Sequence, residues 1–243
     1  MNQPVVASRV RPFIKAVVFD LDGLMLNTED VFELAGQELL ARRGKQMTDL
    51  IRRRMIGRRP LEAFKALTEL TGITEPVSDL IDETREIFSG FAEQHLDCMP
   101  GLFDLLDLIE AHQLPRAVAT SSPRQYMETL LSRFDLLKRF QVTLTAEDVT
   151  HGKPHPEIYL TAAERLNIAS SSILVLEDSE AGTRAAAAAG AFVVAVPNRH
   201  TALGDFSMAS MQLDSLGHPE LHATIAQATE RADQSDFPMN TSG

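Results

Sequence analysis

The stretch VVFDLDGLMLNTED, residues 17–30, decides the fold of this chain of 243 residues. It begins as a short apolar run and then places Asp20, Asp22 and a glycine in quick succession. Short apolar runs of this kind are typical of buried strands in parallel sheets. A carboxylate at the end of such a strand is costly to bury unless a charged or polar group pairs with it. The two aspartates therefore mark a strand end at which some group must offset their repulsion.

Short segments rich in Val, Ile or Ala, with turn or polar residues at their ends, recur along the chain. They predict strands at residues 13–19, 115–120, 173–177 and 191–196, and a weaker one at 141–146. Helical patterns lie between them at residues 123–133, 156–166 and 180–189, the first capped by Ser122 and the last ending at Gly190. Strands that alternate with helices predict an α/β fold with a Rossmann-like, doubly wound parallel sheet.

Residues 28–98 interrupt this alternation, because they contain helical patterns and no convincing strand. We expect this segment to be an all-helical cap domain inserted after the first strand. The α/β core then consists of two pieces, residues 10–27 and 99–230. The polar composition of residues 231–243 predicts a flexible tail.

The composition limits the kinds of partner that the chain can bind. Its formal net charge of −11 argues against nucleic acid, because surfaces that bind nucleic acid are basic. The single cysteine, Cys98, cannot form an internal disulfide, which fits a reducing compartment. No stretch resembles a signal peptide or reaches the roughly 18 apolar residues of a membrane-spanning helix. We therefore expect a cytoplasmic monomer or small homo-oligomer without nucleic-acid or membrane partners.

Residues that can take part in chemistry follow the predicted strands, and ligands of open α/β sheets bind beyond the carboxyl ends of strands. In chain order these residues are Asp20, Asp22, Thr120, Ser121, Ser122, Lys153, Glu177 and Asp178. Crowded carboxylates suit a hard cation such as Mg²⁺, and a helix start preceded by Thr and Ser suits an anion. The sequence therefore predicts a site for a phosphoryl group and a divalent metal. The metal would also offset the repulsion between the two aspartates.

The motifs DLDG (20–23), TSS (120–122), KPHP (153–156) and EDS (177–179), in this order after strands, resemble the haloacid dehalogenase superfamily of aspartyl-phosphate hydrolases. The helical insert after the first motif is similar to the cap of its β-phosphoglucomutase-like and pseudouridine-5'-phosphatase-like branch. That branch includes phosphatases of sugar phosphates and similar small phosphomonoesters. The resemblance covers residues 13–198 and implies a Mg²⁺-dependent phosphatase whose partner is a small phosphorylated metabolite.

The resemblance also implies a role for each residue of the site. Asp20 would be the nucleophile that attacks phosphorus and forms an aspartyl-phosphate. Asp22 would act first as the general acid for the leaving alcohol and then as the base that activates water. Thr120 and the amide of Ser121 would bind phosphoryl oxygens, and Lys153 would neutralise negative charge there.

The metal ligands implied by the resemblance are Asp20, the backbone carbonyl of Asp22, and Asp178. The role of Glu177 stays open, because it could bind the metal directly or through water. Taken alone, each motif has a simpler interpretation. Acidic and hydroxyl residues after strands are also ordinary helix caps.

The stretch RRRMIGRR, residues 52–59, concentrates five arginines in an acidic chain. Arg52–Arg54 are interpreted as a solvated helix end. By resemblance, Gly57 and Arg58 would belong to a cap loop that closes over the site, where Arg58 could hold a second anionic group of the substrate.

Two positions depart from the family pattern. Asn27 stands where many close relatives carry a further aspartate, so we expect altered hinge contacts or substrate preference. Phe32 occupies the position of a histidine in the phosphoglucomutase pattern, which favours hydrolysis over isomerisation. The alternatives are a sugar-phosphate mutase of the same fold and a non-catalytic phosphate-binding module. A P-loop kinase is excluded because no GxxxxGK[ST] motif is present, and the histidines show no metal-ligand spacing.

Overall fold

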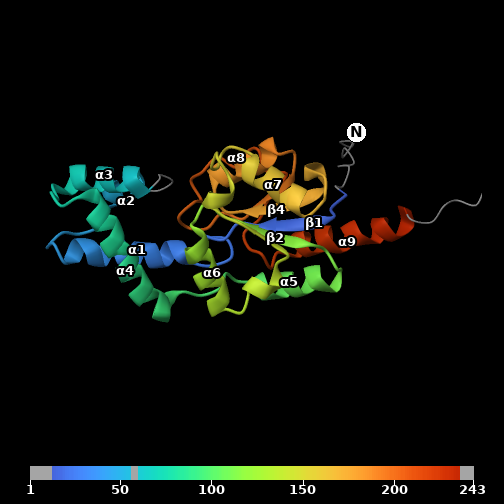
Figure 1. Ribbon diagram of the computed structural model, residues 1–243, viewed down its shortest axis with the longest axis horizontal. Coiled ribbons are helices and arrows are strands. Elements are labelled where there is room, and N and C mark those ends of the chain that lie inside the picture. Colours follow the sequence, from blue (N-terminus) through green and yellow to red (C-terminus); the bar gives the residue numbers. More distant parts are fainter. Residues whose placement is uncertain (1–12, 56–59, 236–243) are drawn as a thin grey trace, which may run out of the picture.

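The computed structural model describes residues 13–55 and 60–235, and a parallel sheet of six strands forms its centre (Figure 1). The strands lie in the order β3-β2-β1-β4-β5-β6, and every neighbouring pair is parallel. In chain order they are β1 (Ala16–Phe19), β2 (Arg116–Ala119), β3 (Val142–Leu144), β4 (Ile173–Glu177), β5 (Phe192–Ala195) and β6 (Met211–Gln212). The predicted doubly wound α/β fold is confirmed, and β6 is an edge strand that the sequence did not indicate.

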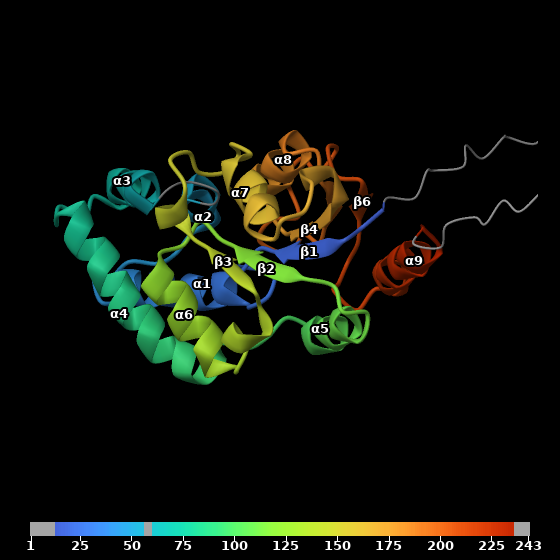
Figure 2. The same ribbon diagram turned by 45° about the vertical axis from the view of Figure 1, so that its right-hand side comes forward.

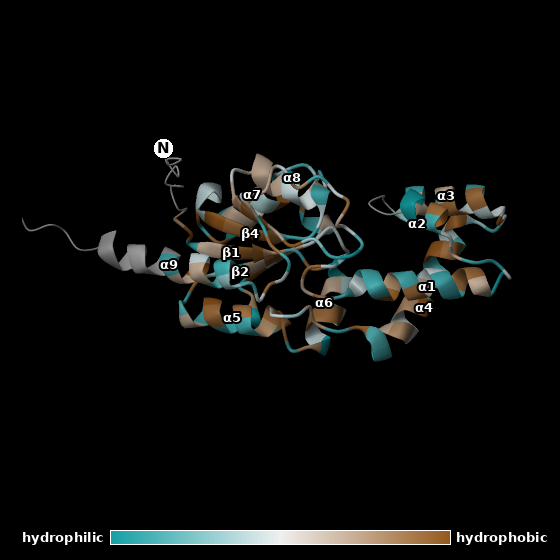
Figure 3. Ribbon diagram, turned by 180° about the vertical axis from the view of Figure 1, so that it is seen from behind, coloured by the Kyte–Doolittle hydropathy of each residue, from teal (hydrophilic) through white to brown (hydrophobic). Residues whose placement is uncertain are grey.

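Helices cover both faces of the sheet, because successive residues of a strand point to opposite sides. Val17 and Phe19 of β1 belong to one hydrophobic cluster, and Ala16 and Val18 belong to the other. The first cluster includes α5 (Leu102–Ala111), α6 (Arg124–Arg133) and α9 (Pro219–Ser235), and the second includes α7 (Glu157–Arg165) and α8 (Glu180–Ala188). Figures 1 and 2 show α7 and α8 on one side of the sheet and α5 and α9 on the other. In Figure 3 the central strands β1 and β4 are coloured as hydrophobic.

Four helices form the cap, which confirms the helical insert that the sequence predicted. They are α1 (Thr28–Ala41), α2 (Asp49–Met55), α3 (Pro60–Thr71) and α4 (Val77–His95). α1 buries Val31, Ala35 and Leu39, which are four residues apart and therefore share one face of the helix. α4 buries Leu80 and Ile87. These side chains belong to the same hydrophobic cluster as β1, so the cap and the core share packed apolar surface.

The two linkers between cap and core pair with each other. Leu26 and Cys98 form an antiparallel bridge. The Asn27 side chain holds the two linkers together through two hydrogen bonds. Its Nδ2 donates to the His95 carbonyl (3.1 Å), and its Oδ1 accepts from the Asp97 N–H (2.7 Å). An ionised aspartate at this position could not make both bonds, since a carboxylate has no hydrogen to donate. The linkers adjoin the domain boundaries expected at residues 27–28 and 98–99, and the division into domains stays a prediction.

Some ends of helices differ from the expectation. α6 begins at Arg124 with Pro123 as its N-cap, and the predicted cap, Ser122, directs its hydroxyl at another residue. α9 continues to Ser235, so residues 231–235 of the expected tail are helical, and residues 236–243 lie outside the described part of the chain. Within the described ranges, no helix combines the length and the apolar character needed to cross a membrane.

Candidate active site

The carboxyl ends of three neighbouring strands meet at one edge of the sheet. Phe19, the last residue of β1, is in register with Val118 of β2 and with Leu176 of β4. Asp20 therefore follows β1 beside Glu177, the last residue of β4. β1 is also where the chain order of the strands reverses, and open α/β sheets bind their ligands at such a point.

Asp20, Glu177 and Asp178 form a buried acidic cluster at this edge. Each offers a carboxylate oxygen, and these oxygens all lie within 4.8 Å of one another. The three residues are only 7%, 0% and 3% exposed. Carboxylates at this depth repel one another strongly, so the cluster requires positive charge close by. The sequence left the role of Glu177 open, and the structure places it inside the cluster.

Lys153 supplies part of that positive charge. Its Nζ donates to Asp20 Oδ1 (2.5 Å), to Glu177 Oε1 (2.6 Å) and to the backbone carbonyl of Ala119 (2.9 Å). These bonds use all three hydrogens of the ammonium group. The Tyr159 hydroxyl donates to the same Glu177 oxygen at 2.5 Å. Lys153 is thus fixed between two carboxylates, although it lies in a loop far from both in the sequence.

Burial and charge shift the acid–base behaviour of these groups. Burial, with the charges of Glu177 and Asp22, raises the pKa of Asp20 to about 8, although Lys153 acts in the opposite direction. Burial and the charges of Asp20 and Glu177 raise the pKa of Asp178 well above its usual range. Burial alone would lower the pKa of Lys153, but the same two carboxylates raise it well above its usual value. The lysine stays charged, whereas Asp20 and Asp178 resist ionisation unless further positive charge lies beside them.

The donor set fits a divalent metal ion. Hard cations such as Mg²⁺ bind carboxylate oxygens, and here three carboxylates face a single lysine. The backbone at Gly23 packs closely against the cluster, because a Cβ on this residue would lie 2.5 Å from Asp178 Oδ2. Asn198 Nδ2 donates to the same Asp178 oxygen at 2.8 Å and so orients it. The buried acidic cluster is therefore a candidate metal site.

The Asp22 carboxylate is not part of the acidic cluster, and three hydroxyl groups hold it. Thr120 Oγ1 and Ser122 Oγ donate to its Oδ2 at 3.1 and 2.7 Å. The Tyr126 hydroxyl donates to its Oδ1 at 3.1 Å. Thr120, which the resemblance assigned to phosphoryl oxygens, therefore directs its hydroxyl at Asp22 in this structure. Ser121 is exposed, and its backbone N–H donates to none of the described residues, so this N–H is open to a ligand.

Three residues of the site were missed by the sequence analysis. Tyr126 lies in the first turn of α6, and no residue pattern in the sequence marks it. Tyr159 lies in the first turn of α7, and Asn198 lies in the loop after β5. No sequence motif marks either residue. Gly57 and Arg58, the expected substrate contacts of the cap, lie outside the described residues.

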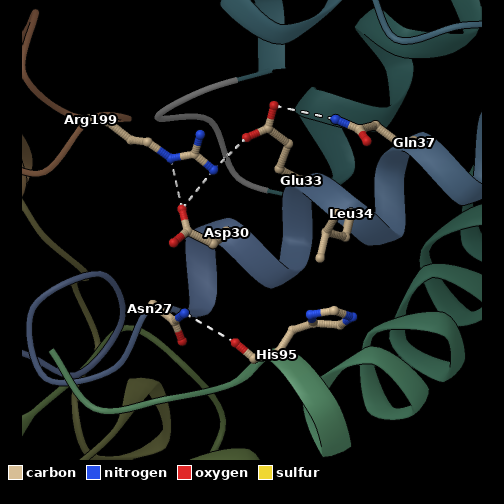
Figure 4. A pocket seen from close by; sticks show the side chains of 7 residues that line it. All are labelled: Asn27, Asp30, Glu33, Leu34, Gln37, His95 and Arg199. Carbon is tan, nitrogen blue, oxygen red and sulfur yellow. Dashed lines mark hydrogen bonds and ion pairs between the residues drawn. The ribbon is translucent and has the colours of Figure 1, made fainter.

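An ion-pair cluster joins the cap to the core beside the linkers. Figure 4 shows it along a pocket of about 420 Å³ lined by Asn27, Asp30, Glu33, Leu34, Gln37, His95 and Arg199. Arg199 of the core donates to Asp30 Oδ1 (2.9 Å) and to Glu33 Oε2 (3.0 Å) of α1. Arg52 donates to Glu33 Oε1 at 2.6 Å. Arg52 is therefore not the solvated side chain that the sequence suggested, whereas the two arginines that follow it are exposed.

The loop that carries Lys153 is braced by a second cluster, although the sequence assigned no role to its histidines. Glu157 accepts from the N–H groups of Thr150 (2.8 Å) and His151 (2.9 Å), and His151 Nδ1 lies 2.9 Å from its Oε2. These bonds, the one from the Thr150 N–H foremost, lower the pKa of Glu157 to about 2. His155 completes the cluster. The contacts hold both ends of the loop at the start of α7.

The doubly wound sheet, the helical cap and the acidic strand ends together define a capped protein with a Rossmann-like core and a candidate metal site at the sheet edge. The chain matches the haloacid dehalogenase-like hydrolase family over residues 17–196, and it therefore belongs to that family. It is a phosphatase of the family, as the ordered motifs predicted.

Similar proteins agree with this assignment. The chain is 33% identical over 181 residues to a phosphorylated carbohydrates phosphatase of Thermotoga maritima, across 73% of this chain and 82% of that protein. Its fold is similar to that of CbbY from Rhodobacter sphaeroides in complex with phosphate, with a TM-score of 0.72 at 26% identity. That alignment covers 88% of this chain and 99% of CbbY. β-Phosphoglucomutase from Clostridium difficile has the same fold, with a TM-score of 0.70 at 21% identity over 91% and 99% of the two chains.

Proposed function

We propose that the protein is a Mg²⁺-dependent phosphatase that hydrolyses a small phosphomonoester through an aspartyl-phosphate on Asp20. One observation carries the proposal: the Asp20 carboxylate accepts a hydrogen bond from Lys153 and lies beside the carboxylates of Glu177 and Asp178. Phosphoryl transfer requires mostly positioning and electrostatic stabilisation, and these groups provide both.

In the first step, an oxygen of Asp20 attacks phosphorus while the bond to the leaving alcohol breaks. Oδ1 of Asp20 is tied to Lys153, and no described residue donates to Oδ2, so Oδ2 is the oxygen available for attack. Asp22 gives its proton to the departing alcohol oxygen. Thr120 and the N–H of Ser121, which precede α6, would bind phosphoryl oxygens once Thr120 turns its hydroxyl from Asp22.

In the second step, water replaces Asp20 on phosphorus. Asp22, now ionised, takes a proton from the water, and the bond between phosphorus and the Asp20 oxygen breaks to release inorganic phosphate. Asp20, Asp178 and the backbone carbonyl of Asp22 would hold the Mg²⁺, with Glu177 binding directly or through water. When bound, the metal supplies positive charge that offsets the negative charge of the phosphoryl group and of the carboxylates.

The substrate class we propose is a phosphorylated sugar or a similar small metabolite. The Thermotoga maritima relative acts on phosphorylated carbohydrates, as its name states. Phe32, at the place of the histidine in the mutase pattern, packs its ring against Phe88 with centroids 4.2 Å apart and has no group that transfers protons. The lack of a proton-transferring group at this position favours hydrolysis over transfer of the phosphoryl group within a sugar.

The Asp20→Asn variant tests the nucleophile. We expect turnover of p-nitrophenyl phosphate with Mg²⁺ to fall at least about a thousandfold, because the amide oxygen is a poor nucleophile. The thermal unfolding midpoint should stay within a few degrees of the parent, since the amide can still accept from Lys153. The matched control is Asp82→Asn on the cap surface, where the carboxylate contacts exposed Arg85.

Undiminished turnover by Asp20→Asn would show that the nucleophile is another residue. Glucose 1-phosphate separates hydrolysis from the mutase alternative, because a phosphatase releases inorganic phosphate whereas a mutase forms glucose 6-phosphate. No Mg²⁺-stimulated release of phosphate from a broad panel of metabolites would favour a non-catalytic binding module.

A further inference from the structure

The two oxygens of the Asp22 carboxylate have different surroundings. Oδ2 accepts from Thr120 and Ser122, both of which follow β2 in the core. Oδ1 accepts from one described donor, the Tyr126 hydroxyl at 3.1 Å. A carboxylate oxygen has two lone pairs, so Oδ1 keeps one lone pair for exchange of a proton. The direction of that lone pair depends on the side chain that holds Oδ1.

The Tyr126 ring lies between the core and the cap. It belongs to α6 of the core, and its centroid is 5.8 Å from that of Phe88 in α4 and 6.4 Å from that of Phe32 in α1. The rings of Phe32 and Phe88 are themselves 4.2 Å apart. Aromatic pairs at such separations attract each other beyond the effect of their buried area. Two cap side chains therefore fix the ring that reaches Asp22.

The hydroxyl of Tyr126 remains a donor. A phenol keeps its proton at neutral pH. The Tyr126 hydroxyl can therefore donate to Asp22 Oδ1, which lies 3.1 Å away. A hydrogen bond from a neutral donor to a charged acceptor is stronger than one between neutral groups, so this bond favours one orientation of the carboxylate.

We propose that Tyr126 is a positioning residue that aims the Asp22 carboxylate at the leaving-group oxygen, and that Phe32 and Phe88 of the cap hold Tyr126 in place. The inference rests on the proposed function, because it assigns Asp22 the proton transfers of the phosphatase reaction. It adds that the precision of this proton transfer depends on the packing of the cap against α6.

The leaving group provides the test. An alkyl phosphate such as glucose 6-phosphate needs a proton at its departing oxygen, whereas p-nitrophenolate leaves without one. kcat/KM reports the steps up to loss of the leaving group. In Tyr126→Phe, kcat/KM for glucose 6-phosphate should fall about tenfold or more, as expected for a misplaced general acid. kcat/KM for p-nitrophenyl phosphate should change less than about threefold, since general-acid help matters little there.

A second variant tests the role of the cap. Phe32 is 37% exposed, so Phe32→Leu should fold. We expect it to reduce the same ratio of kcat/KM values between the alkyl and the nitrophenyl ester, in the same direction as Tyr126→Phe. In the double variant, Phe32→Leu should add no further change to this ratio, because its effect acts through the Tyr126 hydroxyl. The control is Thr129→Ala, which removes an exposed hydroxyl from the same helix.

Equal losses for both esters in Tyr126→Phe would overturn the inference, because they would indicate a structural role only. Additive effects of Phe32→Leu and Tyr126→Phe would overturn the role of the cap. Failure of the proposed function is a separate outcome, since the parent protein would then hydrolyse neither ester in an Asp20-dependent way.

Discussion

Gly182 and Gly90 both lie inside helices, but only Gly182 faces a buried carboxylate. A Cβ at Gly182 would come within 1.7 Å of Glu177 Oε1, whereas a Cβ at Gly90 would meet nothing within 4 Å. Gly182→Ala must therefore displace Glu177 from Lys153, at a cost of about 1–3 kcal/mol, the usual range for overpacking. Gly90→Ala should instead stabilise the protein by about 0.5–1 kcal/mol, because glycine is a poor helix former.

Denaturant unfolding measures both changes, and phosphatase assays show whether the site is affected. Activity should fall in Gly182→Ala and stay unchanged in Gly90→Ala. If both variants gained stability, the packing of α8 against Glu177 would be looser than the structure has it.

Single residues of the site differ in how far the sequence could predict them. Asp20, Lys153 and Asp178 follow strands within ordered motifs, and the register of a parallel sheet brings such residues to one edge. Tyr126 and Asn198 carry no such mark. Both make contacts that depend on the angle of a helix or on the path of a loop, which residue patterns do not encode.

At the scale of the elements, α1 is attached to the core through Glu33. This carboxylate accepts from Arg199 of the core and from Arg52 of α2, and its side chain is 16% exposed. Glu33→Gln leaves two guanidinium groups without their shared carboxylate. We expect it to lower the free energy of unfolding by about 1–3 kcal/mol, as for a partly buried hydrogen bond to a charged group. Hydrogen exchange should become faster in α1 and α2.

The control for Glu33 is Asp82→Asn, which removes an ion pair from the same cap. Asp82 and Arg85 are 67% and 65% exposed, so the loss should stay below about 1 kcal/mol. An effect of Glu33→Gln no larger than that of the control would mean that the Arg199–Glu33 pair does not hold the cap to the core.

The strands were easier to predict than the ends of the helices. Apolar runs identified β1, β2, β4 and β5, because a strand buried on both faces excludes polar residues. The starts of α6 and α7 were each placed one residue early, whereas α8 begins at Glu180 as predicted. Pro123 and Pro156 were expected as first helical residues, yet both are N-caps. The fixed φ of proline suits either position, so the sequence alone does not distinguish them.

At the scale of the whole molecule, the position of the cap depends on contacts between distant parts of the chain. The rings of Phe32 and Tyr126 and the pair of Glu33 with Arg199 join residues far apart in the sequence. Patterns of apolar residues predicted that a helical insert exists and where it begins. They did not predict how it packs, since that depends on the meeting of side chains from separate elements.

Stability of the whole protein should depend on the metal, because the acidic cluster lies among the central strands that hold the fold together. A ligand that binds only the folded state stabilises it by about 2.7 kcal/mol at a hundred times its dissociation constant. For a chain of this size that corresponds to a rise of roughly 5–11 °C in the unfolding midpoint. We expect Mg²⁺ to produce such a rise, measured by calorimetry against a sample with EDTA.

Asp178→Asn should change both the stability of the protein without metal and its response to Mg²⁺. Burial and the charges of Asp20 and Glu177 raise the pKa of Asp178, which means that its ionised form is unfavourable in the metal-free fold. At neutral pH the parent must take up a proton at Asp178 when it folds without metal, whereas the amide is always neutral. The variant should therefore be more stable than the parent in EDTA. It should also gain less from Mg²⁺, because a ligand is lost. A parent protein whose unfolding midpoint does not respond to millimolar Mg²⁺, or a variant that responds equally, would show that the acidic cluster does not bind the metal.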